Sequence, residues 1–169
     1  MFGPVARGTW TSRLAASPFK HLDVGKAELI RERLLLAPVR GVPEVQLYTA
    51  HPGSRLRQLV PGTRAPYWAY PWAGGQALAR YVLDNPGVVA GRRVLDLGTG
   101  AGLVGIAAAK AGAAMVTAVD IDPWAVAATN LNATANGVVI DVTCADLLDG
   151  LPPATDIILA GDLFYDRRL

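Results

Sequence analysis

The sequence is poor in the residues that build covalent frameworks and metal centres. It contains one cysteine, Cys144, and two histidines, His21 and His51. A single cysteine excludes a disulfide framework within this sequence and a zinc site built on several cysteines. Cys144 falls in a predicted strand, where we expect it to be a small buried hydrophobic residue. The histidines lie in loop-like sequence, so we expect neither a metal site nor a histidine base.

Net charge and long apolar runs are also scarce. The net charge is +2, and Lys and Arg do not gather in one run, which argues against a nucleic-acid partner. No uninterrupted stretch of about 18 apolar residues is present, so the sequence predicts no membrane partner. Hydrophobic residues nevertheless make up 51% of the 169 residues. That share suits one folded domain with a sizeable core.

The first 22 residues contain no acidic residue and several basic ones. This composition suits a disordered tail or a transit-type segment. We interpret residues 1–24 as a tail and 25–169 as one domain, with an N-terminal extension over 25–90 and a core over 91–169. The single cysteine and the lack of a clear signal peptide favour the cytoplasm. The mitochondrial matrix is the alternative if the tail is a transit segment.

The extension is predicted to form two helices and a strand. Ala27, Ile30 and Leu34 have helical spacing and predict a helix over about 25–37, which Pro38 ends. Alternation predicts a strand over 44–48, and a second helix is expected over about 74–84. Four aromatic residues precede the second helix: Tyr67, Trp68, Tyr70 and Trp72.

From residue 92 onward, short apolar strands alternate with helices. Strands are predicted over 93–97, 114–119, 138–144 and 156–160, and helices over 102–111 and 122–136. Asp122 is a good N-cap, and Pro123 suits the first helical position. Buried strands that alternate with helices indicate an α/β fold with a parallel, doubly wound, Rossmann-like sheet.

A glycine-rich turn, Gly98-Thr99-Gly100-Ala101-Gly102, joins the first of these strands to its helix. Glycines let the backbone approach a ligand closely, and the start of a helix presents free N–H groups. The turn overlaps a G-x-G-x-x-G pattern, which is weak evidence by itself. A turn without a ligand is the simpler alternative.

Each predicted parallel strand has an acidic residue at or just past its carboxyl end: Asp96, Asp120 with Asp122, Asp146 and Asp162. That edge of an open α/β sheet is where ligands bind. Carboxylates there suit a cation with hydroxyl groups better than a pyrophosphate. S-adenosylmethionine has a sulfonium, an ammonium and a ribose diol, and it has no phosphate. Asp120 lies about 20 residues past the turn, where an acid reaches ribose hydroxyls, whereas Asp122 is better explained as a helix cap.

The sequence resembles class I S-adenosylmethionine-dependent methyltransferases, and within them the electron transfer flavoprotein beta subunit lysine methyltransferases. The similar segments are residues 94–102 (motif I), 119–122 (the acidic motif after it), 43–47 (an N-terminal strand), 66–81 (the aromatic segment) and 161–166, with its D-x-x-Y pattern. The resemblance implies a protein-lysine methyltransferase with S-adenosyl-L-methionine as cofactor and the electron transfer flavoprotein beta subunit as protein partner.

The resemblance also implies roles for individual residues. Gly98, Thr99 and Gly100 line the methionine end of the cofactor, and Asp120 binds its ribose. Asp146, or Ala145 beside it, borders the adenine, and Trp72 and Gly161 also border the cofactor. Asp162 and Tyr165 face the substrate lysine as the catalytic candidates. Asp96 and Gly102, at the strand end and in the turn, complete the predicted cofactor-binding set. We expect Asp162 to orient a neutral amine, and Tyr165, Trp68 and Tyr70 to form an apolar mouth that lowers the pKa of that amine.

Three alternatives remain open at this point. Class I methyltransferases usually have seven strands, whereas this chain ends at Leu169, just after the fourth predicted strand. The resemblance therefore predicts a domain without the C-terminal strands, which would make an inactive cofactor-binding fragment one alternative. A small amine such as nicotinamide is an alternative methyl acceptor. An NAD-dependent oxidoreductase is less favoured, because Asp96 lies where a pyrophosphate would bind.

Overall fold

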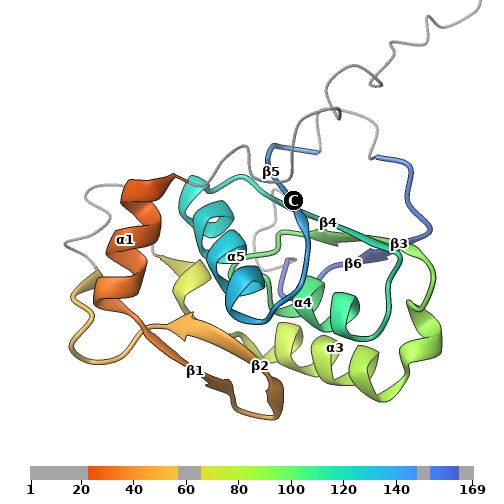
Figure 1. Cartoon of the computed structure of the whole chain (residues 1–169), viewed down its shortest axis with the longest axis horizontal. Coiled ribbons are helices and arrows are strands. Elements are labelled where there is room, and N and C mark those ends of the chain that lie inside the picture. The colour runs from red at the N-terminus through yellow and green to blue at the C-terminus, as the bar shows by residue number, and fades with distance from the viewer. Residues whose placement is uncertain (1–22, 57–65, 148–152, 164–169) are drawn as a thin grey trace, which may run out of the picture.

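A four-stranded parallel sheet forms the centre of the molecule (Figure 1). The computed structural model describes residues 23–56, 66–147 and 153–163. The strands are β3 (Arg93–Leu97), β4 (Met115–Asp120), β5 (Asp141–Cys144) and β6 (Ile157–Leu159), in the spatial order β5-β4-β3-β6. This arrangement confirms the predicted parallel α/β sheet. The chain adds β4 and β5 on one side of β3 and then β6 on the other side. Open α/β sheets bind ligands at such a switch point.

Two helices connect the parallel strands. Helix α4 (Leu103–Lys110) joins β3 to β4, and α5 (Pro123–Ala135) joins β4 to β5. Both crossovers run in the same direction across the sheet, so the right-handed crossover rule places both helices on one face. Asp122 caps α5 as predicted, because its carboxylate accepts a hydrogen bond from the Trp124 amide.

The N-terminal extension contains a helix, a β-hairpin and the helix α3. Helix α1 (Val24–Arg33) begins inside the predicted tail, the rest of which lies outside the described residues. The hairpin pairs β1 (Leu35–Val39) antiparallel with β2 (Val42–Thr49), and α3 (Ala73–Asp84) packs on α4. The strand predicted over 44–48 and the helix over 74–84 are confirmed.

The predicted helix over 25–37 is wrong in its last part. Leu34 already has an extended backbone, and residues 35–39 form β1. The run Leu34-Leu35-Leu36-Ala37 has good helical propensity, but pairing with β2 gives its backbone hydrogen bonds that local propensity does not outweigh. Pro38 is tolerated because β1 is the edge of a two-stranded sheet.

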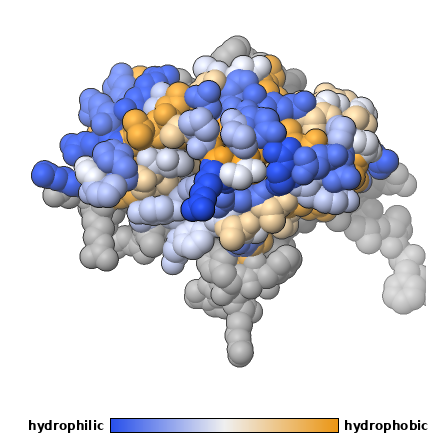
Figure 2. Space-filling model, turned by 90° about the horizontal axis from the view of Figure 1, so that it is seen from below, coloured by the Kyte–Doolittle hydropathy of each residue, from blue (hydrophilic) through white to orange (hydrophobic). Residues whose placement is uncertain are grey.

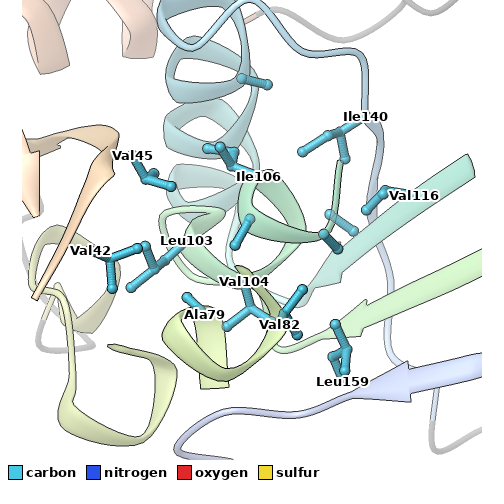
Figure 3. Close-up of a cluster of buried hydrophobic side chains, with 14 of the residues drawn as sticks. Val42, Val45, Ala79, Val82, Leu103, Val104, Ile106, Val116, Ile140 and Leu159 are labelled. Carbon is cyan, nitrogen blue, oxygen red and sulfur yellow. The ribbon is translucent and has the colours of Figure 1, made fainter. Parts of the chain in front are cut away.

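Two clusters of buried side chains hold these layers together. The larger one joins α3, α4, β2 and the parallel sheet, and Figure 3 labels its members Val42, Val45, Ala79, Val82, Leu103, Val104, Ile106, Val116, Ile140 and Leu159. The smaller one joins α1, the aromatic segment and α5 around Ile30, Trp68 and Leu131. Each large aliphatic side chain buried here contributes about 1.5–3 kcal/mol to folding.

The expectation that Cys144 is buried is wrong. Cys144 is exposed at the carboxyl end of β5, and its thiol lies 3.7 Å from the Ile121 carbonyl oxygen. Within the described part of the sheet, β5 pairs only with β4, so it is an edge strand. Three of its four residues are exposed, which is why the apolar pattern of the sequence did not predict burial correctly.

The face of the molecule in Figure 2 is mostly hydrophilic, with small hydrophobic patches between polar side chains. On α3, Arg80 forms ion pairs with Glu44 of β2 and with Asp84, both at 2.8 Å. These groups are exposed, so solvent screens the pairs. Among the described helices, none combines the length and the apolar composition that crossing a membrane requires.

Candidate functional site

The glycine turn leaves β3 in a left-handed conformation. Gly98, Gly100 and Gly102 have φ angles of +66°, +56° and +87°. Side chains disfavour this region, so glycine is needed for the backbone to turn here. The amides of Gly98 and Thr99 donate to the Val119 carbonyl oxygen at 2.9 and 3.1 Å. The turn is therefore fixed against the end of β4.

Asp96 holds the glycine turn from behind. Its carboxylate accepts hydrogen bonds from Thr99 Oγ1 at 2.6 Å and from the Gly105 amide at 2.8 Å. A Cβ atom on Gly105 would lie only 3.0 Å from Asp96 Oδ2, so glycine in α4 makes room for this contact. Burial raises the pKa of Asp96 to about 6.

Asp96 lies near the carboxyl end of β3 as expected, but its side chain is not exposed at that edge of the sheet. Its side chain is only 2% exposed, because the turn folds over it. Direct contact with a cofactor stays a prediction. The observed contacts show that Asp96 orders the turn and the first residues of α4.

Asp120 joins the end of β4 to the middle of the turn. Its carboxylate accepts hydrogen bonds from the Gly100 and Asp122 amides, each at 2.9 Å. The side chain is half-buried, and burial raises its pKa. The structure therefore brings together the two motifs that the sequence placed 20 positions apart. The ribose contact of Asp120 stays a prediction.

Two polar residues of α5 hold the turn from the opposite side, and sequence analysis missed both. Thr129 Oγ1 donates to the Gly100 carbonyl oxygen at 3.0 Å, and Asn132 Nδ2 donates to the Ala101 carbonyl oxygen at 2.9 Å. Both side chains are fully buried. They are polar residues three positions apart, on the same face of an alanine-rich helix. Polar side chains on a buried helix face need hydrogen-bond partners, so this pair could have indicated a contact with a neighbouring loop.

Asp162 binds the start of α3. Its carboxylate accepts hydrogen bonds from the Gly74 amide at 3.1 Å and the Gly75 amide at 2.5 Å. Trp72, the N-cap residue of α3, makes no capping bond with its own side chain. Asp162, from a distant part of the chain, therefore caps the free amides at the start of α3. Its own backbone is left-handed, with a φ of +55°.

Glycines allow α3 to approach the end of β6 this closely. A Cβ atom on Gly161 would lie 2.9 Å from Gly75 Cα. A Cβ atom on Gly98 would lie 2.4 Å from Leu163 Cδ1. The end of β6 thus packs on both α3 and the glycine turn. The catalytic role of Asp162 stays a prediction, and Tyr165 lies outside the described residues.

The aromatic segment is divided between core and surface. Trp68 is buried and stacks on Trp124, with ring centroids 5.9 Å apart, so its expected place in an exposed mouth is incorrect. Tyr67, Tyr70 and Trp72 are about half exposed. The Trp72 ring lies 5.7 Å from Tyr67 and 6.5 Å from Tyr70. Trp72 Nε1 also donates to the Tyr67 carbonyl oxygen at 2.9 Å, which orients the indole.

The end of β5 lies next to the end of β4. The Ala145 amide donates to the Asp120 carbonyl oxygen at 3.0 Å, and the exposed Asp146 follows directly. The predicted adenine contact of Asp146 stays a prediction, as do the cofactor contacts of Trp72 and Gly161. The carboxyl edge of the sheet therefore presents the turn, Asp120 and Asp146 together, with Asp162 on the β6 side.

Known proteins resemble part of this chain. The family model of the ribosomal protein L11 methyltransferases (PrmA) matches residues 76–163. The electron transfer flavoprotein beta subunit lysine methyltransferases of Danio rerio and Mus musculus are each 50% identical over 105 residues. These alignments cover 62% of this chain, and the chain spans only 41% of either relative.

A solved structure of a ribosomal protein L11 methylase from Lactobacillus delbrueckii subsp. bulgaricus is also similar. Its sequence is 35% identical, and the match covers 52% of this chain and 45% of that one, with a TM-score of 0.45. The segment matched by the family model contains the glycine turn and all the acidic residues of the predicted site.

Proposed function

Because this chain belongs to the ribosomal protein L11 methyltransferase (PrmA) family, we propose that it is an S-adenosylmethionine-dependent enzyme that methylates a lysine side chain of a protein. The observation that carries the proposal is the hydrogen bond between Asp120 and the Gly100 amide. It places a half-buried carboxylate against a left-handed glycine turn at the carboxyl edge of a parallel sheet. That combination suits a cationic nucleoside without phosphate.

The residues at this edge fit S-adenosylmethionine. Leu163 and Thr129 leave no room for a Cβ atom at Gly98 and Gly102, so the turn needs glycine at these positions. A Cβ atom at Gly100 would meet only Trp68 Cα, at 3.9 Å, so the middle of the turn has space for a ligand beside it. An ionised carboxylate has about four acceptor positions, so the two amide bonds of Asp120 leave capacity for ribose hydroxyls. We assign the methionine end to Gly98, Thr99 and Gly100.

The adenine end is assigned to the neighbouring strand ends. Ile121 is 48% exposed and Ala145 is partly buried, and both directly follow the ends of β4 and β5. An apolar side chain beside the exposed Asp146 would offer one surface for the flat face of the base and one acceptor for its amino group. We propose that these residues border the adenine.

When bound, S-adenosylmethionine supplies an electrophilic methyl group. The protein must then bring a neutral amine into line with it, which is chiefly a matter of positioning. We propose that Asp162 accepts a hydrogen bond from the acceptor amine. Its two bonds to the α3 amides fix the carboxylate and leave other acceptor positions available.

The exposed aromatic side chains next to α3 support a lysine acceptor. Trp72 is two residues from Gly74, whose amide binds Asp162, so the aromatic surface of Tyr67, Tyr70 and Trp72 borders the proposed acceptor position. Apolar surroundings favour the neutral form of an amine. Aromatic faces also attract a methylated ammonium group. We propose that these three residues, in place of Trp68, form the mouth.

The names of the relatives support a protein acceptor, and we propose the electron transfer flavoprotein beta subunit as the partner. The test is incubation of the protein with isotopically labelled S-adenosylmethionine and, in separate reactions, that subunit or nicotinamide, followed by mass spectrometry. Label on a lysine of the subunit is expected. Label on nicotinamide alone would replace the protein acceptor with a small amine.

The role of Asp162 has a separate test. Asp162→Asn keeps one oxygen for the α3 amides but removes the charge that orients the amine. We expect turnover to fall at least about tenfold while the affinity for S-adenosylhomocysteine stays within about twofold. Turnover equal to that of the unaltered protein would remove Asp162 from the catalytic site and leave it as a cap of α3.

A further inference from the structure

Asn132 connects two parts of the molecule that are far apart in sequence. It lies on α5 and is fully buried. Its Oδ1 accepts a hydrogen bond from the Tyr48 amide of β2 at 2.9 Å, and its Nδ2 donates to the Ala101 carbonyl oxygen of the glycine turn at 2.9 Å. The two partners require opposite atoms of the amide, so the side chain has one orientation that satisfies both.

The bond to Ala101 fixes the peptide unit that closes the turn. A trans peptide points its carbonyl and its N–H in opposite directions. When the Ala101 carbonyl faces α5, the N–H of Gly102 in the same peptide unit faces away from the helix. That N–H donates to the Thr99 carbonyl oxygen at 2.9 Å, inside the turn. Asn132 therefore sets the orientation of the turn-closing peptide.

Two neighbours of Asn132 each make only half of this connection. Asn136, one helical turn later, pairs with Gln46 of β2 by accepting from its amide at 3.0 Å and donating to its carbonyl at 2.6 Å. Thr129 reaches only the glycine turn, through the Gly100 carbonyl. Among the described residues of α5, Asn132 is the one whose side chain hydrogen-bonds both to β2 and to the glycine turn.

We propose that Asn132 is a positioning residue that couples the docking of the β1–β2 hairpin to the conformation of the glycine turn. The hairpin lies beside α5 (Figure 1), and through Asn132 it contributes to the conformation of the proposed cofactor site. Only the identity of the ligand rests on the proposed function. The coupling between β2 and the turn is a property of the protein without ligand.

The first experiment measures this coupling without ligand. Asn136→Ala removes the two bonds to Gln46 and a third bond, to the Asn132 carbonyl oxygen at 2.8 Å, and it touches no residue of the turn. If the hairpin and the turn are coupled, hydrogen exchange of the Gly102 amide should accelerate at least about threefold in this variant. The Ala135→Ser change, at an exposed neighbouring position of α5, is the matched control and should leave that rate unchanged. An unchanged Gly102 rate in Asn136→Ala would overturn the proposal.

The second experiment is a double-mutant cycle read by calorimetric affinity for S-adenosylhomocysteine. Asn132→Asp is nearly isosteric and keeps the acceptor for Tyr48 but loses the donor to Ala101. We expect it to weaken binding about tenfold, and Asn136→Ala to weaken binding about threefold in the native background but not in the Asn132→Asp background. Equal effects of Asn136→Ala in both backgrounds would refute the coupling. If the unaltered protein does not bind this ligand, the proposed function fails, and the exchange measurement still decides the coupling.

Discussion

At the scale of single residues, the buried carboxylate of Asp96 has the clearest consequence for pH. Burial raises the pKa of Asp96 from 3.8 to about 6. The folded state therefore binds this proton more tightly than the unfolded state does. Asp96 favours folding at low pH, and this contribution is lost as the pH rises from about 4 to about 6. A shift of about two pKa units corresponds to about 3 kcal/mol.

Asp96→Asn removes this titration. The free energy of unfolding of the native protein, relative to that of the variant, should fall by up to about 3 kcal/mol between pH 4 and pH 7. Urea denaturation at a series of pH values measures the difference. Asp156, whose pKa the Arg93 guanidinium lowers to about 2, titrates in both proteins and cancels. Parallel curves across this range would show that the ionisation of Asp96 costs no stability.

A second prediction at this scale concerns the left-handed glycines. Gly102 has a φ of +87°, and a Cβ atom there would lie 2.9 Å from Thr129 Cγ2. Gly137 has a φ of +66° with no atom near its Cβ position. Gly137→Ala therefore carries backbone strain alone, about 1 kcal/mol, and Gly102→Ala should cost at least about 1 kcal/mol more. Urea denaturation checks both, and equal losses would mean that Thr129 does not constrain the turn.

At the scale of elements, the ends of β4 and β5 form one edge of the proposed cofactor site. Cys144, the only cysteine of the sequence, lies opposite Asp120 in the β4–β5 register. Cys144 is exposed, and its thiol lies beside the Ile121 carbonyl oxygen. Partial desolvation of the thiol raises its pKa, and the nearby carboxylates of Asp120 and Asp122 raise it further. A ligand on Asp120 and Ile121 would cover this thiol.

Alkylation of Cys144 therefore reports on the site. Saturating S-adenosylhomocysteine should slow modification by iodoacetamide several-fold, because alkylation requires access to the thiolate. Intact mass measured over time gives the rate, and methionine, which has neither an adenosine nor a free thiol, is the control ligand. The same rate with and without S-adenosylhomocysteine would place the adenine elsewhere.

The order of the elements was largely predictable from local patterns. The strand 93–97 and the cap at Asp122 follow from short-range signals, namely an apolar run and an N-cap before proline. The strand 35–39 was not predictable in this way. Its sequence favours a helix locally, and only pairing with β2, a tertiary contact, makes it a strand.

At the scale of the whole molecule, the sequence predicted that the acidic residues share one edge of the sheet, but it did not predict which way each side chain faces. The acids fall at strand ends, so their common edge follows from a parallel sheet. That Asp96 turns inward, that Trp68 joins the core and that Asn132 faces the turn depend on packing between layers. Asp162 is a further case, since its partner α3 lies 87 and 88 positions away in the chain.

The most direct measurement is calorimetric titration of the protein with S-adenosylhomocysteine and, separately, with NAD. The edge of the sheet at Asp120 should bind S-adenosylhomocysteine at one site and NAD not measurably, because a pyrophosphate meets carboxylates there. Asp120→Ala should weaken S-adenosylhomocysteine at least about tenfold, since ribose hydroxyls lose a charged acceptor. Binding of NAD, or an affinity for S-adenosylhomocysteine that Asp120→Ala leaves unchanged, would contradict a methyl-donor site at this edge of the sheet.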